Sequence, residues 1–253
     1  MPLPKASYPV YDFVIPSTKK KIKARPFLVK ENKVILQAIE MGDQDNFINA
    51  IKNVIAACTF NEVNTDVLTM YDVDYLFLQI RAKSVGEISD VRFTCRNDVI
   101  DKETNQYKSC DTSFLMKVDV SQADVVFPSD YTETKIVMVD EKIGIKLRAP
   151  TFEVFQSLKT TETGIDRDFA ISDIFLFSCI ESVFDSESVR VPVKDFNLEE
   201  LSEFVDSLSE KTLQEIESYF KTMPYVGLTL NVKCPSCGNK TTIEYKGLED
   251  FFG

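Results

Sequence analysis

Apolar side chains recur every three or four positions over the first third of the chain, and this period predicts α-helices. The predicted helices cover 30–42, 44–59 and a stretch that begins at Asp66 or Thr69 and ends at Gly86. Ahead of them, residues 8–15 and 19–26 have the character of extended strands. We therefore predict that residues 1–86 form an extended N-terminal arm followed by a helical region.

Beyond residue 86 the apolar period shortens, which indicates β-hairpins, and later lengthens again. The predicted strand pairs are 91–95 with 114–120, 135–139 with 143–148, 182–184 with 189–193, and 226–232 with 242–245. The predicted helices of this part cover 152–160, 166–180, 198–208 and 209–223. We predict an α+β fold with a β-hairpin region (87–150), a helical region (151–225) and a C-terminal hairpin (226–253).

The composition is that of an ordinary soluble globular protein, with 44% apolar and 27% charged residues. No apolar run reaches the roughly 18 residues that a membrane span needs. Residues 1–7 lack the apolar core of a signal peptide. We therefore expect no membrane partner and a reducing cytoplasm, in which cysteines are thiols or metal ligands.

The formal charge of −11 argues against nucleic-acid binding, which needs a concentrated basic surface. The charge is uneven, because residues 17–33 hold seven basic side chains and one acid, whereas residues 195–221 hold eight acids and two lysines. Two interpretations stay open for these patches. In the first, they are complementary surfaces that dock subunits to one another. In the second, they are solvated faces that keep the protein soluble, and a single charged patch is more typical of such a face.

The sequence offers no catalytic machinery of a familiar kind. It contains no histidine, which removes the commonest general base and the usual partner of a serine or cysteine nucleophile. It has only eight glycines, and neither glycine-rich nucleotide motif is present. Paired carboxylates such as Asp72 and Asp74 lie at predicted helix starts, where they favour the helix dipole. We predict that the protein is not an enzyme.

The cysteines are the residues that indicate chemistry. Cys234-Pro-Ser-Cys237-Gly lies between two predicted strands and is typical of one half of a zinc ribbon. The other half is predicted to be Cys95 and Cys110, although fourteen residues separate them and resemble an insertion into a knuckle. The alternative is that this first pair lies in a hairpin without metal. Four thiolates would leave no open coordination position, so we expect one structural zinc per chain, with residues 226–253 packed back on 91–120.

The two remaining cysteines have a simpler interpretation. Cys58 and Cys179 lie on the apolar faces of predicted helices, where a cysteine is typically a buried thiol.

Three stretches together resemble the T4-type phage baseplate protein family, which includes the baseplate hub subunit and the hub-assembly factor. They are Lys23-Ala-Arg-Pro-Phe-Leu-Val-Lys-Glu31, the run from Asp74-Tyr-Leu-Phe to Gly86, and Thr222-Met-Pro224 followed by a strand and Cys-Pro-x-Cys-Gly. The resemblance spans nearly the whole chain. The long spacing between Cys95 and Cys110 departs from a compact knuckle.

This resemblance implies a non-enzymatic role in building the central hub of a contractile tail, in the cytoplasm of the infected host. The implied partners are hub components and the tape-measure protein, which this chain would bind or chaperone. One alternative is a permanent structural subunit of the hub, present in the tail baseplate of the virion. Another is a host-directed zinc-ribbon adaptor, which the acidic charge near the C-terminus disfavours.

For partner binding, the sequence singles out Arg25, Pro26 and Phe27 at a predicted strand-to-helix junction, together with Arg81. A structural interpretation is equally open for the first three, with Pro26 fixing the turn and Phe27 entering the core. Aromatic residues at helical spacing around Arg81 are more often core than interface.

Overall fold

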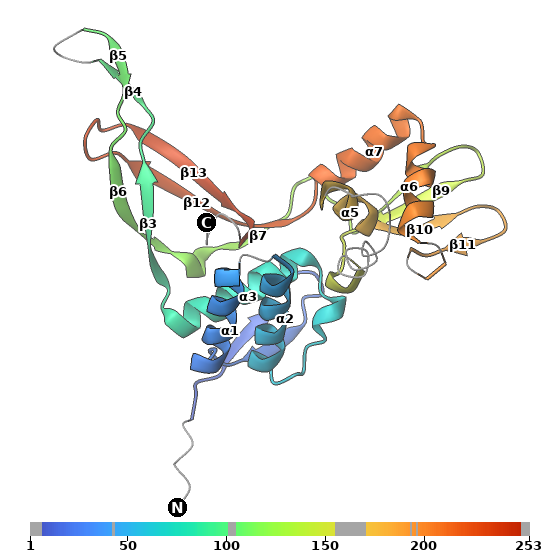
Figure 1. Cartoon of the computed structure of the whole chain (residues 1–253), viewed down its shortest axis with the longest axis horizontal. Coiled ribbons are helices and arrows are strands. Elements are labelled where there is room, and N and C mark those ends of the chain that lie inside the picture. Colours follow the sequence, from blue (N-terminus) through green and yellow to red (C-terminus); the bar gives the residue numbers. More distant parts are fainter. Residues whose placement is uncertain are drawn as a thin grey trace, which may run out of the picture.

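The computed structural model describes residues 7–41, 44–100, 105–154, 171–192, 194–195 and 197–248. Helices and antiparallel sheets are both present, so the predicted α+β class is confirmed. Figure 1 shows the N-terminal helices in the lower centre, a long arm of hairpins that rises from them, and a second sheet with its own helices on the opposite side.

The N-terminal part contains the three predicted helices, and their ends agree with the prediction to within a few residues. It consists of β1 (Tyr11–Val14), β2 (Lys21–Ala24), α1 (Val29–Met41), α2 (Gln44–Cys58), the 3-10 helix η1 (Thr65–Val67) and α3 (Met70–Val85). β1 and β2 pair as an antiparallel hairpin. α3 begins where Thr69 and Asp72 form a capping box, which satisfies two backbone N–H groups at the helix start.

Asp72 also anchors the N-terminal hairpin to α3. Its side chain is fully buried and accepts hydrogen bonds from the Ser17 N–H at 2.8 Å and the Thr69 hydroxyl at 2.7 Å. A buried carboxylate is costly unless hydrogen bonds compensate it, and here they come from two separate segments. The predicted place of Asp72 at a helix start is confirmed.

The arm consists of two long hairpins. β3 (Ile88–Thr94) pairs with β6 (Ser113–Asp119), and β12 (Tyr225–Lys233) pairs with β13 (Lys240–Lys246). After β6 come the 3-10 helix η2 (Val120–Gln122) and β7 (Asp124–Val126), which completes a sheet of order β13-β12-β7. The segment between Cys95 and Cys110, which the sequence presents as an insertion, has secondary structure of its own. This segment forms a further hairpin of β4 (Asp98–Ile100) and β5 (Tyr107–Ser109).

The second sheet has the strand order β11-β10-β9-β8. Its elements and the helices beside it are β8 (Thr134–Met138), β9 (Gly144–Arg148), α5 (Ile171–Ser178), β10 (Ile180–Phe184), β11 (Val189–Arg190), α6 (Leu198–Asp206) and α7 (Glu210–Lys221). The helix predicted to end at Ile180 ends at Ser178, because Ile180 already pairs with Leu147 of β9. Predicted helical residues 155–160 and 166–170 lie outside the described residues.

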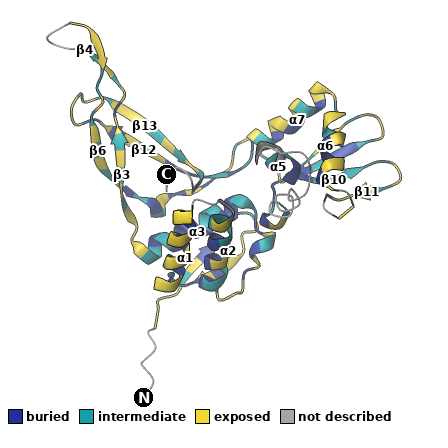
Figure 2. Ribbon diagram, in the orientation of Figure 1, coloured by how far each residue is buried: buried dark blue, intermediate teal, exposed yellow. Residues whose placement is uncertain are grey.

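The buried apolar side chains form two clusters, which Figure 2 shows in dark blue. The first joins the N-terminal part to the base of the arm and includes Val118, Val226 and Leu248. The second lies between the second sheet and α5–α7 and includes Ile145 and Leu147. Residues of the predicted region 87–150 therefore contribute to both clusters, because β8 and β9 pack in the second.

Cys58 and Cys179 are buried thiols, as predicted. Among the helices in the described ranges, none combines the length and apolar character needed to cross a bilayer.

Candidate metal centre

The turn between β12 and β13 places two thiols side by side. The Cys234 N–H donates to the carbonyl of Asn239 at 2.9 Å, and the Gly238 N–H donates to the carbonyl of Cys234 at 3.0 Å. Gly238 has a φ of +73°, a left-handed conformation that glycine adopts without a side-chain clash. The tight turn thus delivers Cys234 and Cys237 to one point at the end of the hairpin.

The turn between β3 and β6 repeats this geometry with a different sequence. The Cys95 N–H donates to the carbonyl of Thr112 at 2.9 Å. Asp111, which follows Cys110, is left-handed with a φ of +47°, as Gly238 is after Cys237. The two turns therefore share the closing hydrogen bond and the left-handed residue.

The β4–β5 hairpin emerges from inside this first turn. It begins at Asp98 and returns at Ser109, and the Cys110 N–H closes its base by donating to the carbonyl of Asn97 at 2.8 Å. Without residues 98–109, the sequence would run Cys95-Arg96-Asn97-Cys110, which is a Cys-x-x-Cys turn. The long spacing between the cysteines is thus a compact turn that a hairpin interrupts.

The structure brings the four predicted cysteines together. All four sulfur atoms lie within 4.8 Å of one another, with Cys95 Sγ at 3.7 Å from Cys237 Sγ and Cys110 Sγ at 3.9 Å from Cys234 Sγ. In a tetrahedral site with Zn–S bonds of about 2.3 Å, the sulfur atoms lie about 3.8 Å apart. The donor set and its spacing therefore fit a zinc ion.

Hydrogen bonds favour thiolates at two of these cysteines. The hydroxyl and the backbone N–H of Thr112 lower the pKa of Cys110 to about 6, and backbone N–H groups of Cys237 and Ser236 lower the pKa of Cys234. The Asn97 N–H lowers the pKa of Cys95, but burial and the neighbouring thiols outweigh it and raise the pKa to about 12. Like charges this close disfavour four thiolates unless a cation lies among them.

The other predicted binding residues lie in the N-terminal part. Arg25 Nη2 is 2.9 Å from Glu31 Oε1, and Arg25 Nη1 donates to the carbonyl of Pro26 at 2.9 Å. Burial raises the pKa of Glu31, but the hydrogen bonds from Arg25 and the Leu28 N–H outweigh it and leave that pKa lowered. These contacts serve the junction between β2 and α1.

Phe27 lies just before α1, and Arg81 lies in α3. Phe27 is buried, and its N–H donates to Ser84 Oγ at 2.8 Å, which ties the start of α1 to the last turn of α3. Arg81 donates to Ser89 Oγ at 3.3 Å. Partner binding by Arg25, Pro26, Phe27 and Arg81 stays a prediction.

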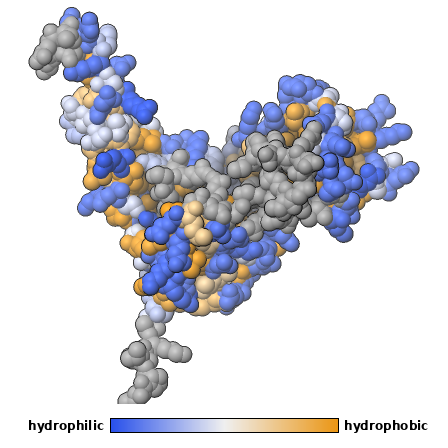
Figure 3. All heavy atoms as spheres, viewed as in Figure 1, coloured by the Kyte–Doolittle hydropathy of each residue, from blue (hydrophilic) through white to orange (hydrophobic). Residues whose placement is uncertain are grey.

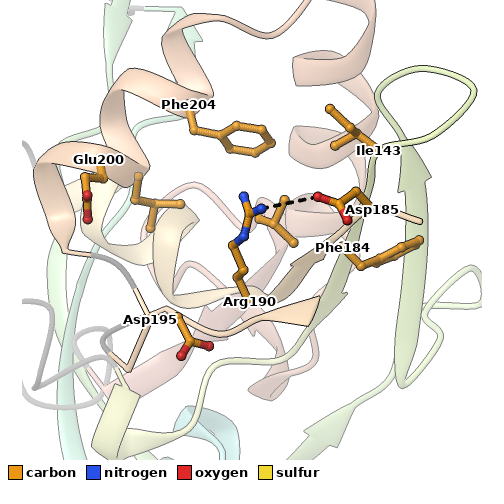
Figure 4. Close-up of a pocket in the computed structure, with 9 residues that line it drawn as sticks. Ile143, Phe184, Asp185, Arg190, Asp195, Glu200 and Phe204 are labelled. Carbon is orange, nitrogen blue, oxygen red and sulfur yellow. Dashed lines mark hydrogen bonds and ion pairs between the residues drawn. The ribbon is translucent and has the colours of Figure 1, made fainter. Parts of the chain in front are cut away.

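A pocket of about 460 Å³ in the second part is a site that the sequence did not indicate. Figure 4 shows the Arg190 guanidinium directed toward Asp185, 3.3 Å away, with the Phe204 ring above it. The acidic groups also serve local structure, because Asp195 accepts the Val191 N–H and Glu200 accepts the Asn197 N–H. No local sequence motif predicts the pocket, because the residues that line it come from separate strands, turns and α6.

The chain belongs to the family described as T4 bacteriophage base plate protein, which matches residues 8–253. Among individual proteins, it is similar to the baseplate hub assembly protein gp26 of Enterobacteria phage T4. The two are 25% identical over 243 residues, which cover 96% of this chain and 97% of the relative. No solved structure matches the chain.

Proposed function

We propose that the protein is a non-enzymatic assembly protein of the tail baseplate hub, which binds or chaperones hub components and the tape-measure protein. Membership of the base plate family and the similarity to a hub assembly protein along nearly all of both chains support this role. The observation that carries the proposal is the family match over residues 8–253, and a metal held by all four cysteines would have no open coordination position, so that site would be structural.

We also propose that Cys95, Cys110, Cys234 and Cys237 hold one structural zinc. Zinc would supply charge compensation and four bonds that join the two hairpins of the arm. The protein's own residues fix the ligand positions through the two left-handed turns at Asp111 and Gly238. In this role the metal would stabilise the arm by joining its two hairpins.

The function is tested with phage that lack this gene, complemented in the infected host by wild type, by Cys234→Ser or by Ser236→Ala. Ser236→Ala is the matched control, because it alters the same turn without removing a ligand. We expect baseplate hubs, seen by electron microscopy and sedimentation, with wild type and with Ser236→Ala only. Normal hubs without the gene would disprove the assembly role.

Mass spectrometry of purified tails separates two forms of this role. Absence of the protein from finished tails supports a transient assembly factor. Its presence in a fixed ratio to other hub proteins would instead identify a permanent subunit of the hub. The host-directed zinc-ribbon adaptor has no support in the fold, the cysteine cluster or the family.

A further inference from the structure

The N-terminal hairpin of β1 and β2 has a row of lysines on its outer face. Lys21 and Lys23 of β2 are exposed, and they alternate with two apolar residues that are buried in the first cluster. Lys19 and Lys20, which lie between β1 and β2, are exposed as well. Residues 7–24 contain these four lysines and a single acid. The outward face of this hairpin is therefore basic.

These lysines have no carboxylate partners in the described part of the chain. No described carboxylate lies within ion-pair distance of Lys20, Lys21 or Lys23. Lys19 Nζ lies over the Phe127 ring, 4.9 Å from its centroid, and this contact leaves its charge uncompensated. Lysines also bring the net charge of −11 closer to zero, which does not favour solubility. Solvation alone therefore does not explain the basic face.

The solvent-facing side of α6 has the opposite charge. Glu199, Glu203 and Asp206 are exposed and follow the spacing i, i+4, i+7, so they form one stripe, while Leu198 and Leu201 are buried in the second cluster. The sequence of α6 holds no basic residue. Figure 3 shows the surface over α6 and α7, at the upper right, as mainly hydrophilic.

The acidic stripe is not explained by the stability of α6. Glu199 and Glu203 are like charges one turn apart, which disfavours a helix. Among the described residues, no basic group forms an ion pair with either of them. The stripe is thus a second charged surface without a partner in its own chain.

The basic and acidic faces match in spacing as well as in charge. Residues i and i+2 of a strand, such as Lys21 and Lys23, are about 7 Å apart along its axis. Residues i and i+4 of a helix, such as Glu199 and Glu203, are about 6 Å apart. The two faces do not meet within one chain, because β1 and β2 (dark blue) lie with the N-terminal helices, away from α6 (Figure 1).

We propose that the protein associates with itself, with Lys21 and Lys23 of one copy docked against Glu199 and Glu203 of a second copy. Charge complementarity selects this occupant, because every copy of the chain carries both faces in equal number. A nucleic acid is disfavoured, because the net charge of −11 repels a polyanion. This contact goes beyond the assembly role and does not depend on it.

The association is tested on the purified full chain by sedimentation equilibrium, with a reductant present to exclude intermolecular disulfides. At ~0.1 mM protein, which detects a contact with a Kd of about that value, the mass in ~0.1 M salt should exceed that of the monomer. In ~1 M salt, where the Debye length falls from about 10 to about 3 Å, the protein should be monomeric. A monomer at both salt concentrations, or an oligomer that salt leaves unchanged, would overturn the proposal.

Charge reversal of each face locates the contact. The basic-face variant carries Lys21→Glu and Lys23→Glu. The acidic-face variant carries Glu199→Lys and Glu203→Lys. Each should be monomeric in ~0.1 M salt. The loss in the acidic-face variant separates a specific contact from general repulsion, because this variant has a smaller net negative charge than wild type and yet should associate less.

A control variant with Lys117→Glu and Lys142→Glu is matched to the basic-face variant. It has the same net charge, and both of its lysines are exposed outside the N-terminal hairpin. It should associate as wild type does. Circular dichroism confirms that each variant is folded. An equal loss of association in this control would contradict the assignment of the contact.

Mixing the two face variants tests the pairing itself. Both faces are acidic in the basic-face variant, and both are basic in the acidic-face variant, so an equimolar mixture should restore the mass of wild type. A mixture that stays monomeric would overturn the proposal. A short DNA duplex that binds monomeric wild type, but not the basic-face variant, would instead assign the lysines to a nucleic acid. None of these outcomes bears on hub assembly, which the loss of the gene tests separately.

Discussion

The two cysteine turns of the arm have the same backbone geometry but different sequences. Each is closed by an N–H of its first cysteine and has a left-handed residue after its second cysteine. The turn at Cys234 is continuous, whereas the turn at Cys95 contains the β4–β5 hairpin between its third and fourth positions. The relative position of Cys95 and Cys110 therefore depends on how the ends of the inserted hairpin are held together, not on its length.

What holds the interrupted turn is a pair of short-range constraints. Asp98 pairs with Ser109 at the base of the hairpin, and the Cys110 N–H donates to the carbonyl of Asn97. Together they bring Cys110 back beside Asn97, the residue that precedes the inserted hairpin. The inserted hairpin consequently projects from the arm without separating Cys95 from Cys110.

If the two turns contribute equally to one metal site, loss of a cysteine from either turn should reduce zinc binding and stability by the same large amount. Cys95→Ser and Cys234→Ser should each reduce bound zinc from about one ion per chain to none, as measured by metal analysis. When the free zinc concentration is a thousandfold above the Kd of the wild-type protein for zinc, the free energy of unfolding of each variant should also be ~4 kcal/mol lower than that of wild type. Cys58→Ala removes a thiol elsewhere and should keep its zinc. Zinc retained in Cys95→Ser would show that the first turn is not part of the site.

Substitutions at the two left-handed residues, Gly238 and Asp111, should have smaller effects on stability, and these effects should differ between the two turns. Gly238→Ala should cost about 1 kcal/mol in chemical denaturation, because a β-carbon is disfavoured at a φ of +73°. Asp111→Gly should change stability by less than about 0.5 kcal/mol, because relief of strain is offset by glycine's entropy and the lost Ser109 hydrogen bond. A larger cost for Asp111→Gly would mean that its side chain is essential to the first turn.

Thr112 gives the first turn a property that is measurable without metal. Its hydroxyl is 3.2 Å from Cys110 Sγ and is the largest contribution to the lowered pKa of that thiol. In zinc-free protein, alkylation of Cys110 should therefore have its midpoint at a pH of about 6. Thr112→Val should move the midpoint upward, toward the ordinary value of about 8.5. Mass spectrometry of alkylated peptides gives both profiles, and identical profiles would refute the role of Thr112.

The smallest effect is expected from removing the interruption itself. Excision of residues 98–109 would make the first turn a continuous Cys-x-x-Cys, so zinc content should stay at about one per chain. Metal analysis and a thermal melt check this expectation. Loss of zinc in this variant would show that the hairpin shapes the ligand site.

Most of the fold follows from local patterns in the sequence. α1, α2, α3, α6 and α7 and the long strands of the arm are long enough for their apolar periods to be visible, and their caps are ordinary ones such as Thr69 and Asn197. The Cys234 turn is predictable for the same reason, because its ligands, proline and glycine are adjacent.

The remaining features depend on contacts between distant segments. β4, β5 and β7 have three residues each, which is too short for an alternating pattern to stand out. Ile180 fits a helical period, but its pairing with Leu147 places it in a strand. A pocket of about 210 Å³ that is lined by residues of α1 and α3 is also invisible in the sequence, because Leu36 of its lining looks like an ordinary core position until the helices are placed.

The order of the cysteines along the chain has a consequence for synthesis. The second apolar cluster is built from residues between Val137 and Tyr219, so the ribosome has made all of it before Cys234 is added. The first cluster must wait for Val226 and Leu248, and the metal site must wait for Cys237. At about 5–20 residues per second, the buried residues of the second cluster are all synthesised a few seconds before the last residue of the first. A chain that stops before Cys234 carries only two of the four ligands proposed for zinc, so we expect zinc uptake only after synthesis has passed Cys237.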